Sequence, residues 1–211
     1  LGASVGCPAD QYAPQGQNWS FPPVIPHQLV AHQYSYFIET LRVNMRYAGA
    51  IRIDHAMGLT RLFWIPPSGD ALQGLYVRYP VQDMIGIISL ESQRNQCVVV
   101  GEDLGTVPPG FRELMTDYNM LAYRVFFFMR TWGGGFEGPH VYPELSLVTG
   151  TTHDMHTLYG FWSGDDIELR ESLGHIKEED VAKELETRKH EKENLMRFLQ
   201  SQGFLADDYP I

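Results

Sequence analysis

Three acidic residues stand at the ends of short apolar runs, where the strands of an α/β protein would end. The runs occupy residues 48–55 (AGAIRIDH), 96–103 (QCVVVGED) and 145–154 (LSLVTGTTHD), and the acids are Asp54, Glu102 and Asp154. Parallel strands present their carboxyl ends at one edge of a sheet, so we expect the three carboxylates to share one site. Two carboxylates beside a glycosidic bond are the minimum set for sugar transfer, because one attacks the anomeric carbon while the other protonates the leaving oxygen. The alternative is that these acids only cap helices or bind backbone N–H groups.

Basic and neutral polar side chains accompany the acids. Arg52 lies two residues before Asp54, so both side chains leave an extended strand on the same face and can form an ion pair. His55 and His153 adjoin two of the acids, where a neutral imidazole can donate a hydrogen bond to a sugar hydroxyl. Each histidine can equally be a structural residue.

Aromatic side chains offer flat surfaces on which sugar rings stack. Those expected in loops or at strand ends are Tyr12, Trp19, Phe21, Phe63, Trp64 and Trp132. The aromatic run 126–128 is predicted instead to fill the core, since consecutive residues of a buried strand face both sides of the sheet.

The elements that must position these groups alternate between strands and helices. A fourth apolar run, at residues 123–129, predicts another strand, and helical spacing is found at 28–47, 81–95 and 109–119. In the first of these helices the buried stripe is predicted to consist of Leu29, Tyr36, Phe37, Leu41 and Met45. Residues 7–26 are rich in Pro and Gly and predict a structured surface loop. The segment 164–204 predicts helix with a solvated, charged face.

Continuous apolar strands alternating with helices indicate a parallel sheet covered on both faces. We therefore predict an α/β fold that is part of a (β/α)₈ barrel of the TIM type, with its helices outside. The first residue is Leu1 rather than Met, so we expect a truncated fragment of a longer protein.

The composition argues against several classes of partner. The formal net charge is −10, which does not suit a surface for nucleic acid or for an anionic membrane. No run of about 18 apolar residues and no signal-peptide pattern appears, so a cytoplasmic protein is expected. Cys7 and Cys97 are too few for a disulfide scaffold and are predicted to be reduced.

Three other patterns lack the context that their chemistry needs. Residues 2–6 fit the GxSxG pattern of a nucleophile elbow, but no helix follows them. His153 and His156 do not have the one-turn spacing of helical metal ligands. Residues 133–135 are three glycines without a following Lys-Ser/Thr pair, which favours a turn over a phosphate site. We therefore do not expect a metal site from these patterns.

Four stretches considered together point to one family. They are GQNW at 16–19, RIDH at 52–55, GEDLG at 101–105 and TTHD at 151–154. In order and spacing they resemble glycoside hydrolase family 77, the 4-alpha-glucanotransferases called amylomaltases or disproportionating enzymes. RIDH and HD also occur in the wider alpha-amylase clan, whereas GEDLG after an apolar strand together with GQNW is typical of the amylomaltase branch. The resemblance extends from about Gly2 to Trp162.

This resemblance implies a retaining double displacement that moves an alpha-1,4-glucan segment from a donor to an acceptor maltooligosaccharide. It implies no metal and no organic cofactor. It assigns Asp54 as nucleophile, Glu102 as general acid/base and Asp154 as transition-state stabiliser. The residues that it implies in substrate binding are Arg52, His55 and His153 at the cleavage subsite, and Asp10, Tyr12 and Trp19 in a loop over the acceptor cleft.

The family's chains are longer than this one, so the remainder of the parent catalytic domain is an expected partner. Residues 1–211 would form the C-terminal part of that domain, about strands 3 to 7 of the barrel, with the helical segment at 164–204. Two alternatives stay open: an alpha-glucan hydrolase of the alpha-amylase clan, and a noncatalytic domain that only binds glucan.

Overall fold

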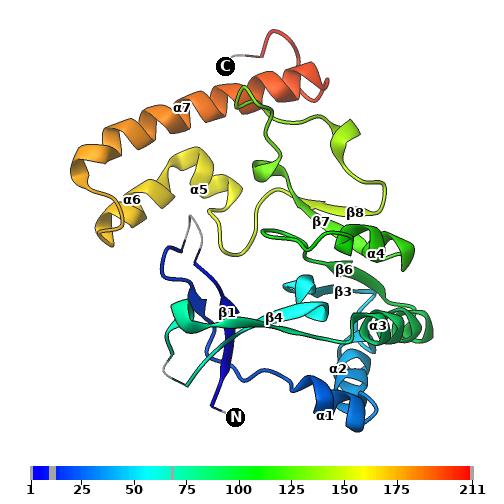
Figure 1. Ribbon diagram of the computed structural model, residues 1–211. Helices are drawn as coiled ribbons and strands as arrows, with labels where there is room; N and C mark the ends of the chain where they lie inside the picture. The colour runs from blue at the N-terminus through cyan, green and yellow to red at the C-terminus, as the bar shows by residue number, and fades with distance from the viewer. Residues whose placement is uncertain (1, 10–12, 68, 210–211) are drawn as a thin grey trace. The chain divides into compact units, whose positions relative to one another are not determined.

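The computed structural model describes residues 2–9, 13–67 and 69–209. The chain forms two compact units, Leu1–Tyr123 and Arg124–Ile211, and each is described by itself. Figure 1 shows their helices and strands. In the described part of the chain, no helix is both long enough and apolar enough to cross a membrane.

A parallel sheet lies at the centre of the first unit. Strand β3 (Ala50–Ile53) pairs with β6 (Val98–Gly101) along its whole length, and β6 pairs in parallel with β7 (Leu121–Val125). Strand β7 continues into the second unit, and β8 (Ser146–Thr149) follows it in the strand order. The α/β class with a parallel sheet is therefore confirmed, and β3, β6 and β8 fall inside the three predicted apolar runs.

The described residues of the first unit form the α-helices α1 (Pro26–Ala31), α2 (Ser35–Met45), α3 (Val81–Asn95) and α4 (Phe111–Asp117). The prediction of a single helix at 28–47 is wrong, because α1 and α2 are separate helices. Gln33 and Tyr34 have φ angles of 52° and 58°, in the left-handed region, and this ends the first helix before the second begins. Tyr36 then points to solvent, 70% exposed, and not into the core.

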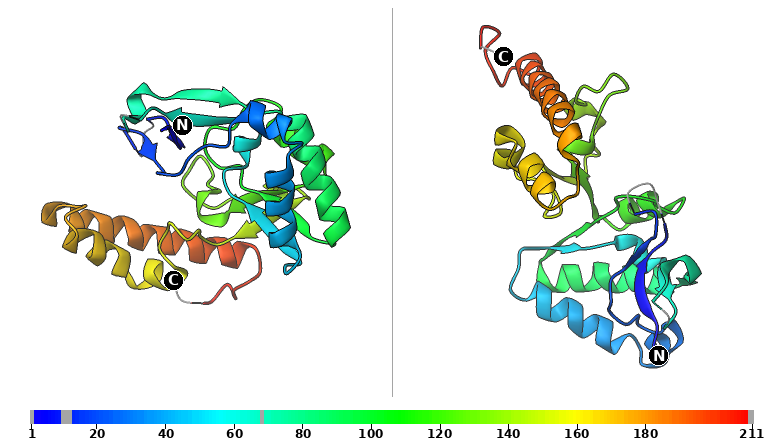
Figure 2. Two further views of the ribbon diagram at one scale, coloured as in Figure 1. Left: turned by 90° about the horizontal axis from the view of Figure 1, so that it is seen from below. Right: turned by 90° about the vertical axis from the view of Figure 1, so that its left-hand side faces the viewer.

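Helices α2 and α3 lie side by side, blue and green in Figure 2. Their inner faces join the strands in one core, whose most deeply buried members are Met45, Ala56, Ile85, Ile88 and Met115. Glu91 of α3 is also buried, and Arg42 of α2 donates to it from Nε and Nη2 at 2.9 Å. These hydrogen bonds, with those from Arg94, lower the pKa of the Glu91 carboxyl.

A second, antiparallel sheet was not predicted. Its strand order is β2 (Gln17–Asn18), β1 (Ser4–Cys7), β4 (Arg61–Ile65) and β5 (Leu75–Arg78). A Cβ on Gly6 would lie 1.9 Å from the Gln17 carbonyl oxygen, so only glycine allows β2 to lie this close to β1. Ser4 is thus part of a strand and not of a nucleophile elbow.

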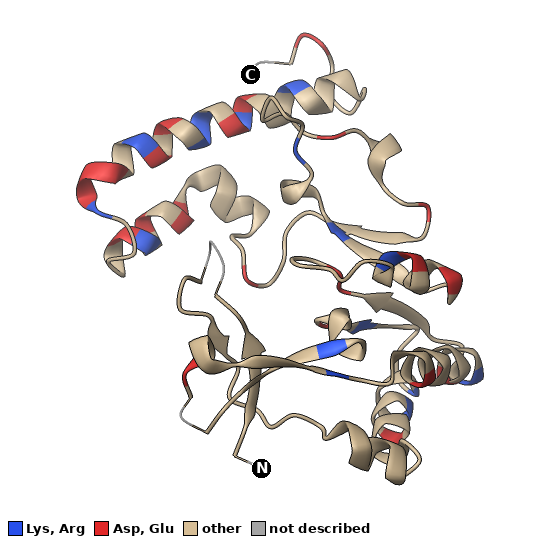
Figure 3. Ribbon diagram, in the orientation of Figure 1, with Lys and Arg blue, Asp and Glu red and all other residues tan. Residues whose placement is uncertain are grey.

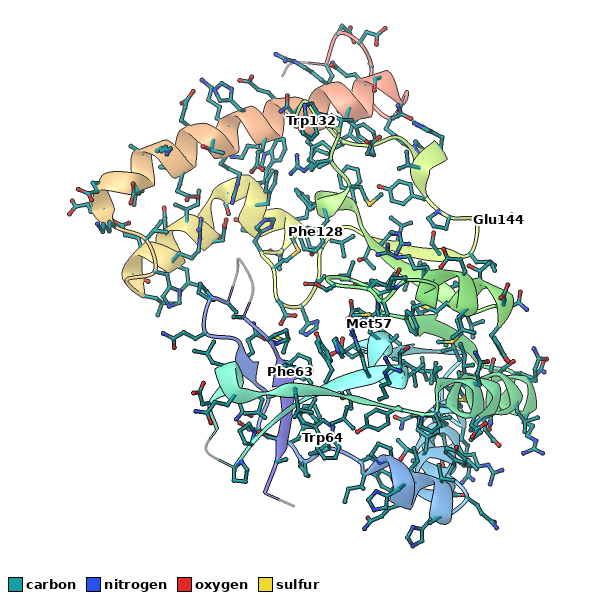
Figure 4. The ribbon with its side chains drawn as sticks, viewed as in Figure 1. Met57, Phe63, Trp64, Phe128, Trp132 and Glu144 are labelled. Carbon is teal, nitrogen blue, oxygen red and sulfur yellow. The ribbon has the colours of Figure 1, made fainter. Side chains whose placement is uncertain are left out.

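The aromatic side chains of β4 pack inside the protein. Phe63 is only 6% exposed and forms a small core with Ile65 and Ala71, so the expected sugar contact at Phe63 is not supported. Trp64 is half-buried, and its indole N–H donates to the Tyr79 hydroxyl at 3.3 Å. Figure 4 shows both side chains on β4. Successive strand residues face opposite sides, which explains how one strand supplies two packing surfaces.

The second unit is largely helical, as expected for 164–204. Its helices are α5 (Leu158–Ser163), α6 (Asp165–Ser172) and α7 (Glu178–Ser201). Charges of both signs follow α6 and α7 in Figure 3. Arg188 of α7 departs from the predicted solvated, charged face, because its side chain is buried. It donates to both carboxylate oxygens of Asp166 and, at 2.8 Å, to the Phe161 carbonyl.

The predicted strand at 123–129 is shorter than expected. Strand β7 ends at Val125, and Phe126–Phe128 form a 3₁₀ turn. Phe127 is buried and Phe126 stacks on Phe136 with ring centroids 4.6 Å apart, as predicted for core residues. Phe128 is 54% exposed, so the prediction that it fills the core is wrong. The turn breaks the two-residue alternation on which that prediction rested.

Candidate active site

The end of β3 carries an acidic and a basic side chain on the same face. Arg52 Nη1 lies 2.6 Å from Asp54 Oδ1, which confirms the ion pair predicted from their spacing. The Arg52 guanidinium also lies over the Tyr123 ring, 4.9 Å from its centroid. The Asp54 side chain is 70% exposed in this chain. A carboxylate held in place by arginine and open on its other side is able to approach an electrophilic carbon.

His55 turns the backbone sharply after Asp54. Its φ of 46° and ψ of 55° are left-handed, and a 3₁₀ turn (Ala56–Leu59) follows. The imidazole meets the Trp19 ring edge to face, with centroids 5.1 Å apart. Burial lowers the pKa of His55 below 6.5, although the nearby charges of Glu102 and Asp54 oppose that shift. The ring is therefore neutral at pH 7 and able to donate or accept a hydrogen bond.

Glu102 follows β6 and lies beside the end of β3. Its Oε2 accepts a hydrogen bond from the His55 N–H at 2.9 Å, and its Oε1 accepts one from the Leu104 N–H at 2.6 Å. Its backbone N–H donates to the Ile53 carbonyl, and its carbonyl accepts from the Ala56 N–H. Glu102 is only 8% exposed. The fold thus brings the candidate acid/base to the turn that carries Asp54, although His55 and Glu102 are 47 positions apart along the chain.

Gly101 leaves room for this arrangement. A Cβ at this position would lie 2.7 Å from Met115 Cε and 3.2 Å from Ala56 Cβ. Met115 of α4 and Ala56 of the turn after β3 therefore pack closely against the backbone directly before Glu102. A side chain here would require Met115, Ala56 or the strand end to move.

The loop that carries Trp19 is fixed by the antiparallel sheet. The Trp19 N–H donates to the Val5 carbonyl at 2.9 Å, and the Trp19 ring stacks on Phe21 with centroids 6.2 Å apart. Trp19 therefore lies beside His55 and next to the Asp54 turn. The other two residues expected in this loop, Asp10 and Tyr12, lie outside the described residues.

The third predicted acid belongs to the second unit. Asp154 and His153 lie in the loop after β8, with His153 Nε2 3.2 Å from Asp154 Oδ2. Both side chains are more than two-thirds exposed, and the Asp154 N–H donates to Thr152 Oγ1. Because the two units are described separately, the convergence of Asp154 with Asp54 and Glu102 stays a prediction.

The remaining sequence patterns have structural roles. His156 packs its ring against Phe127 and Phe161, with centroids 5.4 and 5.3 Å away. Gly134 adopts a φ of 82° in a turn. The nearby Trp132, labelled in Figure 4, is fully exposed. Among residues 2–9, 13–67 and 69–209, no group of three or more His, Cys, Asp or Glu side chains is placed to hold a metal ion.

Sequence comparison decides the family. Residues 1–209 match glycoside hydrolase family 77, described as 4-alpha-glucanotransferase. The chain belongs to this family. The resemblance found in the four short stretches is confirmed, and the 4-alpha-glucanotransferase match extends beyond the segment 2–162 as far as residue 209.

Two curated 4-alpha-glucanotransferases illustrate the relationship. The protein of Haemophilus influenzae is 39% identical over 209 residues, which make up 99% of this chain and 30% of that protein. The protein of Mycobacterium tuberculosis is 40% identical over 210 residues, or 98% of this chain and 29% of that protein. The chain therefore spans less than a third of the length of these relatives.

Solved amylomaltases share the fold. The crystal structure of amylomaltase from Corynebacterium glutamicum matches with a TM-score of 0.90 and 34% identity, covering 98% of this chain and 29% of that chain. An amylomaltase from Streptococcus agalactiae in complex with acarbose has a TM-score of 0.70 at 20% identity, a likeness of fold alone, over 99% of this chain and 37% of that chain. Amylomaltase is a TIM-barrel enzyme, and the prediction that this chain is part of such a barrel is confirmed.

Proposed function

We propose that the protein containing this chain is a 4-alpha-glucanotransferase that moves alpha-1,4-glucan segments from donor to acceptor maltooligosaccharides. The hydrogen bond from the His55 N–H to Glu102 Oε2 supports this most directly. This bond holds the Glu102 carboxylate at the turn that carries Asp54. The chain that contains both acids belongs to the 4-alpha-glucanotransferase family. Two carboxylates beside one glycosidic bond are what a retaining double displacement requires.

In the proposed mechanism, Asp54 attacks the anomeric carbon of the donor and forms a covalent glycosyl intermediate. The ion pair with Arg52 fixes the direction of its carboxylate. Glu102 protonates the departing glycosidic oxygen and then removes the proton from the acceptor 4-hydroxyl. Two successive inversions at the anomeric carbon leave the alpha configuration unchanged.

The remaining predicted residues complete the proposed site. Asp154 stabilises the positive charge that develops on the sugar ring, and His153 beside it binds sugar hydroxyls. His55, in its neutral form, also binds sugar hydroxyls. Trp19 supplies a surface on which a sugar ring stacks. Asp10 and Tyr12 are assigned to the same acceptor loop.

We place these residues in the C-terminal part of a (β/α)₈ domain, about strands 3 to 7. The remainder of the catalytic domain, from the parent protein, supplies the other strands, and maltooligosaccharides and alpha-1,4-glucans are the proposed substrates. The proposed location of the activity is the cytoplasm, and neither a metal nor an organic cofactor takes part in the proposed steps.

The deciding experiment incubates the full-length protein with maltotriose and separates the products by size. The wild-type protein should give glucose together with chains longer than the substrate. Asp54→Asn should abolish this transfer, while Asp117→Asn, at an exposed aspartate at the end of α4, should leave it intact. Near-normal turnover by Asp54→Asn would reject the assignment.

The same assay separates the alternatives. Products that are all shorter than maltotriose would identify an alpha-glucan hydrolase, since water would then be the acceptor. Binding of maltotriose without turnover by the wild-type protein would identify a noncatalytic glucan-binding domain. A first product in the beta configuration would overturn the retaining mechanism.

A further inference from the structure

A second acid follows Glu102 directly and is more deeply buried. Asp103 is 0% exposed, whereas its partner Arg112, on α4, keeps a half-exposed side chain. Arg112 Nε donates to Asp103 Oδ2 at 2.7 Å, and Arg112 Nη2 donates to the Asp103 carbonyl at 3.0 Å. One guanidinium therefore holds both the side chain and the backbone of Asp103.

The other oxygen of Asp103 reaches the neighbouring strand. Oδ1 accepts a hydrogen bond from the Tyr123 N–H at 3.0 Å. The parallel pairing of β6 with β7 runs from Val100 opposite Leu121 to Gly101 opposite Ala122. Tyr123 is the next residue of β7, so the Asp103 side chain extends the connection between the strands beyond the last paired residues.

Tyr123 connects this acid to the proposed nucleophile. Its buried ring lies under the Arg52 guanidinium, whose Nη1 is 2.6 Å from Asp54 Oδ1. Asp103 therefore fixes the backbone of a residue that supports the Arg52–Asp54 pair. Asp103 also follows Glu102 directly, so the Arg112 bond to its carbonyl restrains the backbone next to Glu102.

We propose that Asp103 is a positioning residue that holds the carboxylates of Asp54 and Glu102 in their relative places through Tyr123 and Arg112. The inference rests on the proposed function, because it assumes that those two carboxylates react with the glucan. Asp103 acts through other residues and does not touch the sugar. Groups behind a reacting side chain set its orientation, and a displacement of about 1 Å at a reacting atom lowers a rate by about 100-fold.

The test compares two buried acids in the full-length protein. Asp103→Asn keeps the shape but places an amide NH₂ or a weaker acceptor against Arg112. Glu91→Gln is the matched control, since Glu91 is 2% exposed, pairs with Arg42 and Arg94, and lies on α3 away from the proposed site. Both variants are assayed with maltotriose at a temperature where circular dichroism shows them fully folded.

We expect Asp103→Asn to lower kcat by about 10- to 100-fold and to change KM much less, because positioning matters most in the transition state. Glu91→Gln should be less stable than the wild type but have the same kcat. Equal kcat values for the folded forms of the two variants would overturn the proposal and leave Asp103 a purely structural residue.

A second variant keeps the proposal testable if Asp103→Asn does not fold. Arg112→Lys retains the positive charge but loses the two-pronged contact with the Asp103 side chain and carbonyl. We expect Arg112→Lys to lower kcat less than Asp103→Asn does, again with KM nearly constant. A wild-type kcat in Arg112→Lys would contradict the positioning role. If the wild-type protein itself performs no transfer, the proposed function fails. Transfer by the wild type together with unchanged variants rejects only the role of Asp103.

Discussion

Glu102 Oε2 accepts a hydrogen bond from the His55 backbone N–H, across 47 positions of the chain. Because the donor is a backbone group, the bond fixes Glu102 relative to the path of the chain and not to a mobile side chain. The donor also follows Asp54 immediately, so the two proposed catalytic acids share one rigid turn. This relationship supports the following predictions, all for the full-length protein.

Replacing Glu102 by Gln should lower kcat by about 100- to 10,000-fold, since proton transfer by a positioned acid contributes this much. An amide has one acceptor oxygen, and Glu102 uses both of its oxygens to accept backbone hydrogen bonds. The variant should therefore also lose about 1–3 kcal/mol of unfolding free energy. Steady-state kinetics and urea denaturation measure the two effects. A variant with wild-type kcat would exclude Glu102 as the acid/base.

Gly101→Ala should destabilise the protein by about 1–3 kcal/mol, because its Cβ would overlap Met115 and crowd Ala56. It should also lower activity by displacing Glu102. The control is Gly86→Ala in α3, where a Cβ would meet nothing within 4 Å and helix propensity should add about 1 kcal/mol. Thermal unfolding of both variants makes the comparison, and similar melting temperatures would show that the strand end tolerates a side chain.

Trp19→Ala should raise the pKa of His55 toward 6.5, because the Trp19 ring covers the imidazole that burial keeps neutral. A histidine with a lowered native pKa binds fewer protons when folded. Its contribution to stability is thus complete above pH 6.5 and is lost as the pH falls through its native pKa. NMR titration of the imidazole checks the shift, with Trp162→Ala in α5 as a control that should not change it. An unchanged His55 titration in Trp19→Ala would mean that other groups bury the ring.

Glu91→Gln should destabilise the protein at neutral pH and progressively less under acid conditions. The Arg42 hydrogen bonds lower the pKa of Glu91 below 4.5, so the ionised pair stabilises the fold above that pH and the effect disappears as the pH falls further. Melting temperatures of wild type and variant should therefore converge in acid. Glu39→Gln is the exposed control, since Glu39 pairs with the same arginine at the surface and should matter little at any pH. A constant difference between wild type and Glu91→Gln would contradict the assigned cause.

The buried parallel strands were predictable because their apolar runs are continuous and each ends in polar residues. Residues 50–53 and 98–101 have that pattern, and their parallel pairing places Glu102 at the turn that carries Asp54. The antiparallel sheet was missed because β2 has only two residues, in a segment rich in Gly and Pro, and because β1 (SVGC) contains no continuous apolar run. Their pairing depends on contacts with β4, which no local pattern reveals.

Two kinds of local detail escaped the sequence patterns. The left-handed residues Gln33 and Tyr34 divide an otherwise helical spacing, and neither is the glycine that normally signals such a conformation. Asp103 escaped because no local pattern distinguishes it from Glu102, the neighbouring acid. Burial distinguishes the two acids, since Asp103 has no exposed surface, and burial of an acid depends on partners such as Arg112 and Tyr123.

The parallel pairing of β3 with β6 has a consequence for folding kinetics. The chain between them includes β4, β5 and α3, so the contact between Asp54 and Glu102 depends on closing a long loop. Contacts of this kind form slowly, because loop entropy is lost before the pairing compensates for it. During synthesis, the pair cannot form until β6 has left the ribosome. When this strand pair opens during unfolding, Asp54 and Glu102 separate from each other in a single event.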